Sequence, residues 1–200
     1  MYRGSGPRVL PIIIVIIVVA LVVAALVTVG RMLFSGGGSS DNTDNTTVSL
    51  QDAVLDKSSD RAVRWTVRGP IVADEKFRSY QITVTPTSRT FVTYSGYLDQ
   101  VNDTKKYDNN ARAYEEFVFA LDKASIGKTR KSSDEEFRGV CATNGIACMF
   151  ETVKQGDVDN SVWSSSCKDS AGTLGATPAK IQALFVNQIP DFAPLFNEIY

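Results

Sequence analysis

The chain has 200 residues, 44% of them hydrophobic, and its 21 Lys and Arg side chains almost balance its 22 Asp and Glu side chains. It contains no histidine, which excludes a Ser-His-Asp triad, a Cys-His pair and any imidazole-ligated metal site. All acidic side chains and all but three basic ones lie in residues 36–200, which carry a net charge of −4. Because nucleic acids need a basic face, we expect no nucleic-acid partner.

An uncharged apolar run occupies residues 9–29. As a helix it would span about 31 Å, close to the hydrocarbon thickness of a bilayer. We therefore expect residues 9–30 to form a single-pass transmembrane signal anchor. Two arginines precede the run and one follows it, so the positive-inside rule predicts that residues 1–8 are cytoplasmic. A cleavable signal peptide is the alternative, although this run is longer than the usual apolar core of such a peptide.

The anchor is followed by a Gly, Ser, Asn and Thr-rich segment that ends at residue 47. We interpret residues 31–47 as a flexible linker, because the sequence from residue 35 contains no apolar side chain that could pack. The remaining residues, 48–200, are numerous enough to bury one core. With the predicted orientation, they form a single domain outside the cytoplasmic membrane.

The first half of this domain begins with a short helical segment at 48–55 and then alternates with the period of a strand. Residues 63–67 alternate apolar and polar side chains, which predicts a strand with Trp65 in the core. Residues 80–84 alternate in the same way, and a Pro-Thr-Ser turn leads to a third β-rich run at 90–97. These segments predict an antiparallel meander.

The period then becomes helical over 109–125, with a buried stripe and Gly127 as its expected stop. A second hairpin follows, from 146–150 to 161–166, and a last helix begins at the Thr-Pro pair 177–178. The predicted fold is therefore an α+β domain with an antiparallel sheet of about five strands. Its order is β-β-β-α-β-β-α, with the helices packed on one face.

The three cysteines would lie on the oxidising side of the membrane, where we expect one disulfide and one leftover thiol. Cys148 shares a strand face with Ile146 and Phe150, which predicts a free, buried thiol. Cys141 precedes a loop and Cys167 ends the returning strand, so we predict a Cys141–Cys167 disulfide. The pairs 141–148 and 148–167 remain as alternatives.

Candidate catalytic groups are few. Ser125 and Lys128 have the Ser-x-x-Lys spacing of penicillin-recognising enzymes, but the other motifs of those enzymes are missing. Glycoside cleavage would need two carboxylates in one cleft. The sequence brings no two of the candidates together: Glu75, Glu115, Glu116, Glu135, Glu136 and Glu151. We predict no catalytic residue, no metal site and no cofactor.

Several short segments resemble small single-pass exported proteins of ultrasmall, host-attached bacteria. The segments are Arg64–Val67 with Gly69–Glu75, Cys141 with Gly145, Trp163–Cys167, and Leu184-Phe185 with Gln188–Phe192. Such proteins have no assigned activity, so the resemblance implies a location and a shared fold but no catalytic residue. It also implies that Cys141 and Cys167 are the family-like pair and that Cys148 is a departure.

These observations lead to competing functional hypotheses. The first is a non-catalytic module, anchored in the membrane, that binds another envelope or host-surface protein through strand edges or the exposed Phe119. The second is an envelope enzyme that acts on cell-wall glycan or peptide through carboxylates or Ser125 and Lys128. The third is an accessory subunit of a secretion or pilus machine, which differs from the first only in its partner.

Overall fold

The computed structural model describes residues 48–132, 136–141, 145–167 and 170–197. The predicted cytoplasmic segment, anchor and linker all lie outside these residues. Within the described residues, none of the helices has the length and apolar character needed to cross a bilayer. The domain that we describe lies within one compact unit that begins at Thr47.

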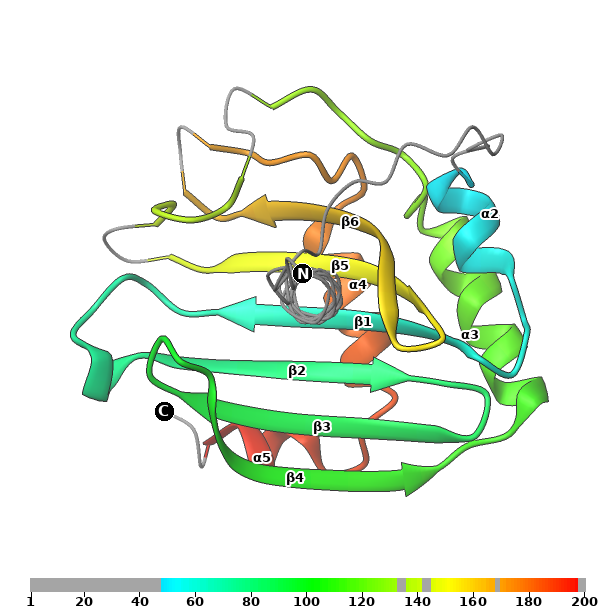
Figure 1. The fold of residues 1–200 in the computed structure, drawn as a ribbon, viewed down its shortest axis with the longest axis horizontal. Helices are drawn as coiled ribbons and strands as arrows, with labels where there is room; N and C mark the ends of the chain where they lie inside the picture. The colour runs from blue at the N-terminus through cyan, green and yellow to red at the C-terminus, as the bar shows by residue number, and fades with distance from the viewer. Residues whose placement is uncertain (1–47, 133–135, 142–144, 168–169, 198–200) are drawn as a thin grey trace, which may run out of the picture. The chain divides into compact units, whose positions relative to one another are not determined.

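A single antiparallel sheet of six strands forms this domain, in the order β4-β3-β2-β1-β5-β6 (Figure 1). The strands are β1 (Arg61–Arg68), β2 (Arg78–Val84), β3 (Ser88–Ser95), β4 (Gln100–Asp108), β5 (Ala147–Lys154) and β6 (Asp157–Ser165). Strand β1 pairs with β2 on one side and with β5 on the other. The first meander and the second hairpin therefore meet at β1, which lies inside the sheet.

The sheet has six strands rather than about five because β4 was not predicted. Of its nine residues only Val101 and Tyr107 are large and apolar, so it lacks the alternation that marks a half-buried strand. It lies at the edge of the sheet, where it pairs only with β3. Backbone hydrogen bonds to β3, rather than burial of its own side chains, make this segment a strand.

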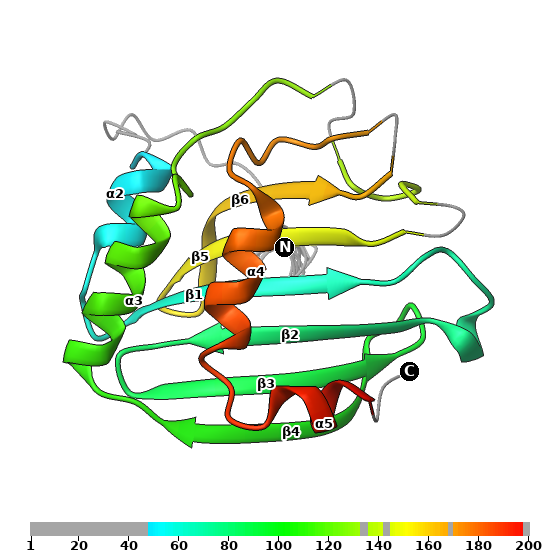
Figure 2. The same cartoon turned by 180° about the vertical axis from the view of Figure 1, so that it is seen from behind.

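The helices are α2 (Leu50–Leu55), the 3-10 turn η1 (Asp74–Lys76), α3 (Ala111–Lys123), α4 (Pro178–Val186) and α5 (Phe192–Asn197). Figure 2 shows α4 and α5 lying across one face of the sheet. The predicted α+β class is thus confirmed for the described residues. The last helix, α5, is an addition to the prediction.

Helix α3 buries the predicted stripe, but its ends differ from the prediction. Its N-cap is Asn110, whose side chain accepts a hydrogen bond from the Ala113 N–H at 2.9 Å. The helix ends at Lys123, and the left-handed residue after it is Ser125 (φ 65°) rather than Gly127. The four buried residues of the stripe are Tyr114, Phe117, Val118 and Leu121.

The core lies between the sheet and the helices and is centred on Trp65. This side chain is fully buried, as predicted, and stacks on Phe185 of α4 with ring centroids 6.0 Å apart. Phe117 of α3 meets the Phe185 ring edge-on, with ring centroids 5.1 Å apart. Sheet and helices therefore share one aromatic cluster, and burial of each large side chain contributes roughly 1.5–3 kcal/mol.

Helix α4 begins at Pro178, as predicted, with Thr177 at the N-cap. The Thr177 side chain makes no capping hydrogen bond, so proline at the first turn is the stronger start signal. Helix α5 follows after Pro190, and its Phe192 and Phe196 rings meet Tyr80 edge-on at 5.6 and 5.9 Å. This contact attaches the end of the described chain to the helix-covered face.

Candidate functional site

One end of the sheet, where β1 ends and β5 begins, is closed by a cysteine pair. The Sγ atoms of Cys141 and Cys167 lie 1.99 Å apart, at disulfide distance, in the pairing that we expected. Gly145 lies against them, because a Cβ there would come within 2.6 Å of the Cys167 Sγ. The Ile71 N–H donates to the Cys141 carbonyl at 3.1 Å. The pair thus connects the segment before β5 to the segment after β6, and the Ile71 hydrogen bond attaches the loop after β1 to the same place.

A pocket of about 420 Å³ opens beside this connection. It lies between the loop after β1, the β3–β4 turn and the segment that leads to the cysteine pair. Its lining residues are Arg68, Gly69, Ile71, Phe77, Tyr97, Asp99, Phe137, Arg138, Gly139, Val140 and Ala147. The volume is within the usual range for small-ligand pockets, and most of these side chains are apolar.

A stack of rings holds the Arg68 side chain in this pocket. Its guanidinium carbon lies 4.9 Å from the centre of the Phe77 ring and 6.0 Å from that of Phe137. Tyr97 stacks on Phe77, with ring centroids 4.2 Å apart. Cation–π contacts of this kind are worth about 0.5–2 kcal/mol each. They restrict the guanidinium and hold its plane among the aromatic rings.

The two turns that border the pocket are bonded to each other. The Tyr97 hydroxyl donates to the Val72 carbonyl at 2.6 Å and accepts from the Val72 N–H at 2.9 Å. The Tyr97 N–H donates to the Asp74 carboxylate at 2.8 Å, next to Gly96, whose φ of 69° suits glycine. These bonds join the β3–β4 turn to the loop after β1, so the pocket has a defined shape.

Exposed apolar side chains lie on the two segments that border this pocket, the loop after β1 and the β3–β4 turn with the start of β4, and we call them the apolar rim. Leu98, at the tip of the β3–β4 turn, is 95% exposed. The other members are Ile71, Val72, Tyr97 and Val101, which are 37–56% exposed. They account for five of the eight large hydrophobic side chains that are exposed in the described residues. Such a concentration is typical of a surface that contacts another molecule.

Two cations and one anion line the pocket. Arg68 pairs with Asp99 through a single nitrogen, Nη1, which lies 3.2 and 3.4 Å from the two carboxylate oxygens. Arg138 is 78% exposed and pairs with Glu136 at 2.8 Å. The lining residues therefore carry one more positive than negative charge, while Glu136, the partner of Arg138, does not line the pocket.

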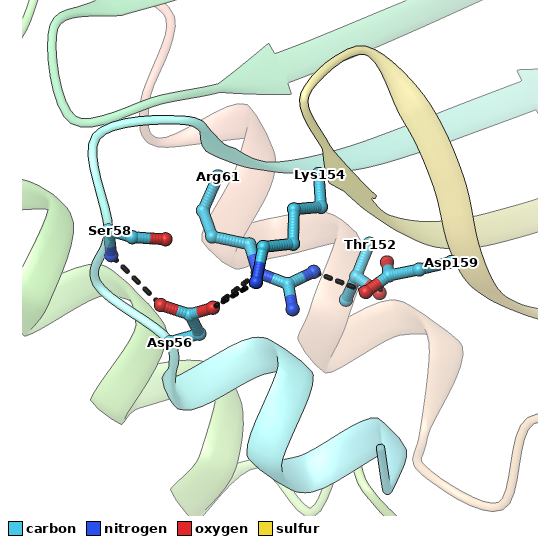
Figure 3. A network of polar contacts seen from close by, with 6 residues as sticks. All are labelled: Asp56, Ser58, Arg61, Thr152, Lys154 and Asp159. Atoms are coloured by element: carbon cyan, nitrogen blue, oxygen red, sulfur yellow. Dashed lines mark hydrogen bonds and ion pairs between the residues drawn. The ribbon is translucent and has the colours of Figure 1, made fainter. Parts of the chain in front are cut away.

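A second polar cluster lies at the opposite end of β1. Arg61 is only 2% exposed, and its guanidinium lies between two carboxylates (Figure 3). Its Nε donates to Asp56, the C-cap of α2, at 2.7 Å, and its Nη1 donates to Asp159 of β6. Asp159 also accepts from the Thr152 hydroxyl at 2.5 Å, and Lys154 approaches Asp56 at 3.9 Å. We call this cluster the Arg61 network.

The pKa values in the Arg61 network follow from these contacts. The hydrogen bond from Arg61 lowers the pKa of Asp56 to about 2, against a smaller opposing effect of burial. Burial would raise the pKa of Asp159, but the bonds from Thr152 and Arg61 outweigh it, and that pKa is lowered. Each carboxyl group is therefore ionised and paired at neutral pH. The network joins α2 to β1, β5 and β6, which is a stabilising role.

The third cysteine, Cys148, is a free thiol in the core. Burial raises its pKa to about 12. A thiol that stays protonated is a poor nucleophile and a poor metal ligand. This placement agrees with the prediction of a free buried thiol.

The candidate catalytic residues lie away from the pocket. Ser125 and Lys128 form a backbone turn after α3, with the Lys128 N–H 3.0 Å from the Ser125 carbonyl oxygen. Neither residue lines the pocket.

Phe119, the contact residue expected for the binding hypothesis, is 43% exposed on α3, where Lys57 lies over its ring at 5.7 Å.

The glutamates are also dispersed. Glu75 is exposed in η1, while Glu115 and Glu116 pair with Arg112 on α3. Glu136 and Glu151 pair with Arg138 and Arg64, and Glu135 lies outside the described residues. The residues that line the pocket include none of these glutamates. Within the described part of the chain, no group of three His, Cys, Asp or Glu side chains is placed to hold a metal ion.

Comparison with known proteins finds neither a family model nor a curated protein that matches this chain. The pocket and its apolar rim are therefore the features of the molecule from which a function can be inferred. Sequence reasoning missed this site, because its residues come from the loop after β1, the β3–β4 turn and the segment before β5. The available signal was an unusually apolar turn, Tyr97-Leu98, between two strands.

Proposed function

We propose that residues 48–200 form a non-catalytic binding module, held outside the cytoplasmic membrane by residues 9–30. Its partner is another protein of the envelope or of a host surface. The observation that carries this proposal is the apolar rim around the pocket at Arg68. The cysteine pair supports an oxidising location, because disulfides persist outside the cytoplasm.

The shape of the surface favours a protein over a lipid partner. Leu98 is 95% exposed and lies in the chain between Tyr97 and Asp99, both of which line a pocket that also includes the charged group of Arg68. The acyl chains of a bilayer would leave the charged groups of such a pocket without polar partners, whereas a protruding side chain or chain end of a protein can supply both apolar and polar groups. Buried apolar anchors of this kind carry most of the affinity in protein interfaces.

Site-specific photocrosslinking in cells tests this proposal. A photoreactive amino acid replaces Leu98 in the full-length protein, and a matched control carries it at Val158. Val158 is 45% exposed in β6, near the β5–β6 turn, at the end of the sheet away from the pocket. We expect a reproducible protein adduct from position 98 that is absent from position 158. Mass spectrometry of the adduct then distinguishes a host protein from a subunit of a secretion or pilus machine.

A second substitution checks that the adduct depends on the apolar rim. Ile71 lines the pocket and is 39% exposed, so Ile71→Asp places a charge in the contact surface with little effect on the core. We expect this change to abolish the adduct at position 98. Adducts to lipid alone, or equal protein adducts from positions 98 and 158, would contradict the proposed function.

A further inference from the structure

We infer that the pocket at Arg68 binds a carboxylate carried beside an apolar side chain, as at the C-terminal end of a partner polypeptide. This inference rests on the proposed function, because it names the chemical group that the same surface takes from its partner. It follows from three properties of the pocket: the donors of Arg68, the charge of the lining and the shape of the walls.

The first property is the availability of the Arg68 donors. Only Nη1 is engaged, and it approaches Asp99 at 3.2 and 3.4 Å without a paired, fork-like contact. Among the described residues, Nε and Nη2 of Arg68 have no hydrogen-bond partner. These two nitrogens form one of the edges of the guanidinium that can bind a carboxylate in a bidentate manner. The contacts with Phe77 and Phe137 restrict the guanidinium before a ligand arrives.

The second property is charge. Arg68 and Arg138 line the pocket against one acid, Asp99. A cationic ligand would face both guanidinium groups, whereas a carboxylate would face one like charge and two opposite ones. Because Arg138 is 78% exposed, its side chain can reorient toward a ligand at small cost. Glu136 already pairs with Arg138, so the unused donors of Arg68, with Arg138 as a second cation in the lining, are what favour an anion in this acidic domain.

The third property is shape. Phe77, Tyr97 and Val140 supply apolar walls within a volume of about 420 Å³. A chain terminus presents a carboxylate and an apolar side chain on one carbon atom, and only one strand of main chain has to leave the pocket. An internal Asp or Glu would bring main chain on both sides into the mouth. Capture of a terminal carboxylate is a recurring mode of peptide recognition.

Fluorescence anisotropy with the full-length protein in lipid nanodiscs tests this inference. The probes are fluorescein-labelled Gly-Ser peptides that end in Leu, Ile, Phe or Trp with a free carboxyl group, and the same peptides with an amidated end. We expect saturable binding of at least one free acid. Its amide should bind about tenfold or more weakly, because hydrogen bonds between charged groups are lost.

Variants then assign the effect to Arg68. Arg68→Gln should remove the difference between acid and amide. Arg68→Lys should weaken acid binding as well, because an ammonium keeps the charge but cannot form the planar fork. The matched control is Arg112→Gln, an arginine on α3 that is 76% exposed, and it should bind as the wild type does.

Several results would overturn the inference. They are equal affinity for acid and amide, unchanged binding by Arg68→Gln, and no saturable binding of any acid. The acid and amide comparison uses the wild-type chain, so it does not depend on how well a variant folds. Crosslinking at Leu98 requires no carboxylate. A protein adduct there, together with acid and amide peptides that bind equally, would refute the ligand and leave the proposed function standing.

Discussion

Replacement of Arg61 by Met should destabilise the fold by about 2–3 kcal/mol at neutral pH. Met keeps most of the apolar volume of the buried side chain but removes the hydrogen bonds to Asp56 and Asp159. Bonds to charged groups contribute roughly 1.5–3 kcal/mol each. We take the lower end because the two carboxylates are 29% and 28% exposed, so water can solvate them after the change.

The lowered pKa of Asp56 reflects the same interaction with Arg61. A reduction from 3.8 to about 2 corresponds to about 2 kcal/mol of preferential stabilisation of the ionised carboxylate. Because the folded-state pKa is the lower one, this contribution is fully present above pH about 4. It is lost as the pH falls through about 2. Wild-type stability should therefore decrease over that interval, and Arg61→Met should decrease less steeply.

Urea unfolding of the full-length protein in nanodiscs measures both effects. Tryptophan fluorescence reports the transition, because Trp65 and Trp163 are buried in the folded state. The control is Arg112→Met. The ion pair between Arg112 and Glu116 is exposed, so this substitution should change the free energy of unfolding by less than about 0.5 kcal/mol. If Arg61→Met were as stable as the wild type, or lost stability in acid as steeply as the wild type does, this reasoning would be refuted.

Three further changes test other parts of the fold. Trp65→Ala removes the centre of the aromatic cluster and should lower the free energy of unfolding by about 3–5 kcal/mol, measured in the same urea assay; a loss below about 1 kcal/mol would show that the core is centred elsewhere. Reduction of the Cys141–Cys167 pair, which closes a loop of 26 residues, should cost about 3.5 kcal/mol in the chain-entropy model. Equal urea midpoints with and without reductant would contradict a disulfide there. The Cys148 thiol, with its pKa raised to about 12, should react with a maleimide at neutral pH only in urea. Rapid labelling of Cys148 in the folded protein, seen by peptide mass spectrometry, would show that this thiol is accessible.

The sequence could predict those strands and helices whose apolar and polar side chains repeat with the period of the element. The alternation around Trp65 predicts β1, and the helical stripe of Tyr114 and Leu121 predicts α3, because each pattern reflects one face turned toward the core. Alternation also places Cys148 on a buried face, which favoured the Cys141–Cys167 pairing over the two alternatives without excluding them. In each case neighbours in the chain carry the whole signal.

The exact helix ends and the edge strand did not follow in this way. Strand β4 is held by backbone bonds to β3, and main-chain groups are the same in every residue, so its side chains carry little signal. Helix α3 ends before Gly127 because Ser125 adopts the left-handed conformation. Local propensity is a weak guide at such boundaries.

The sequence by itself determined the element types of the main strands and helices and the absence of imidazole chemistry, and it predicts an anchor that lies outside the described residues. Only the tertiary structure decided the strand order, the Arg61 network and the pocket at Arg68. In the pocket, Arg68 lies between Phe77 and Phe137, which are 60 positions apart in the chain. No periodic pattern records such a contact, because it exists only after β5 has paired with β1 and brought these distant segments together.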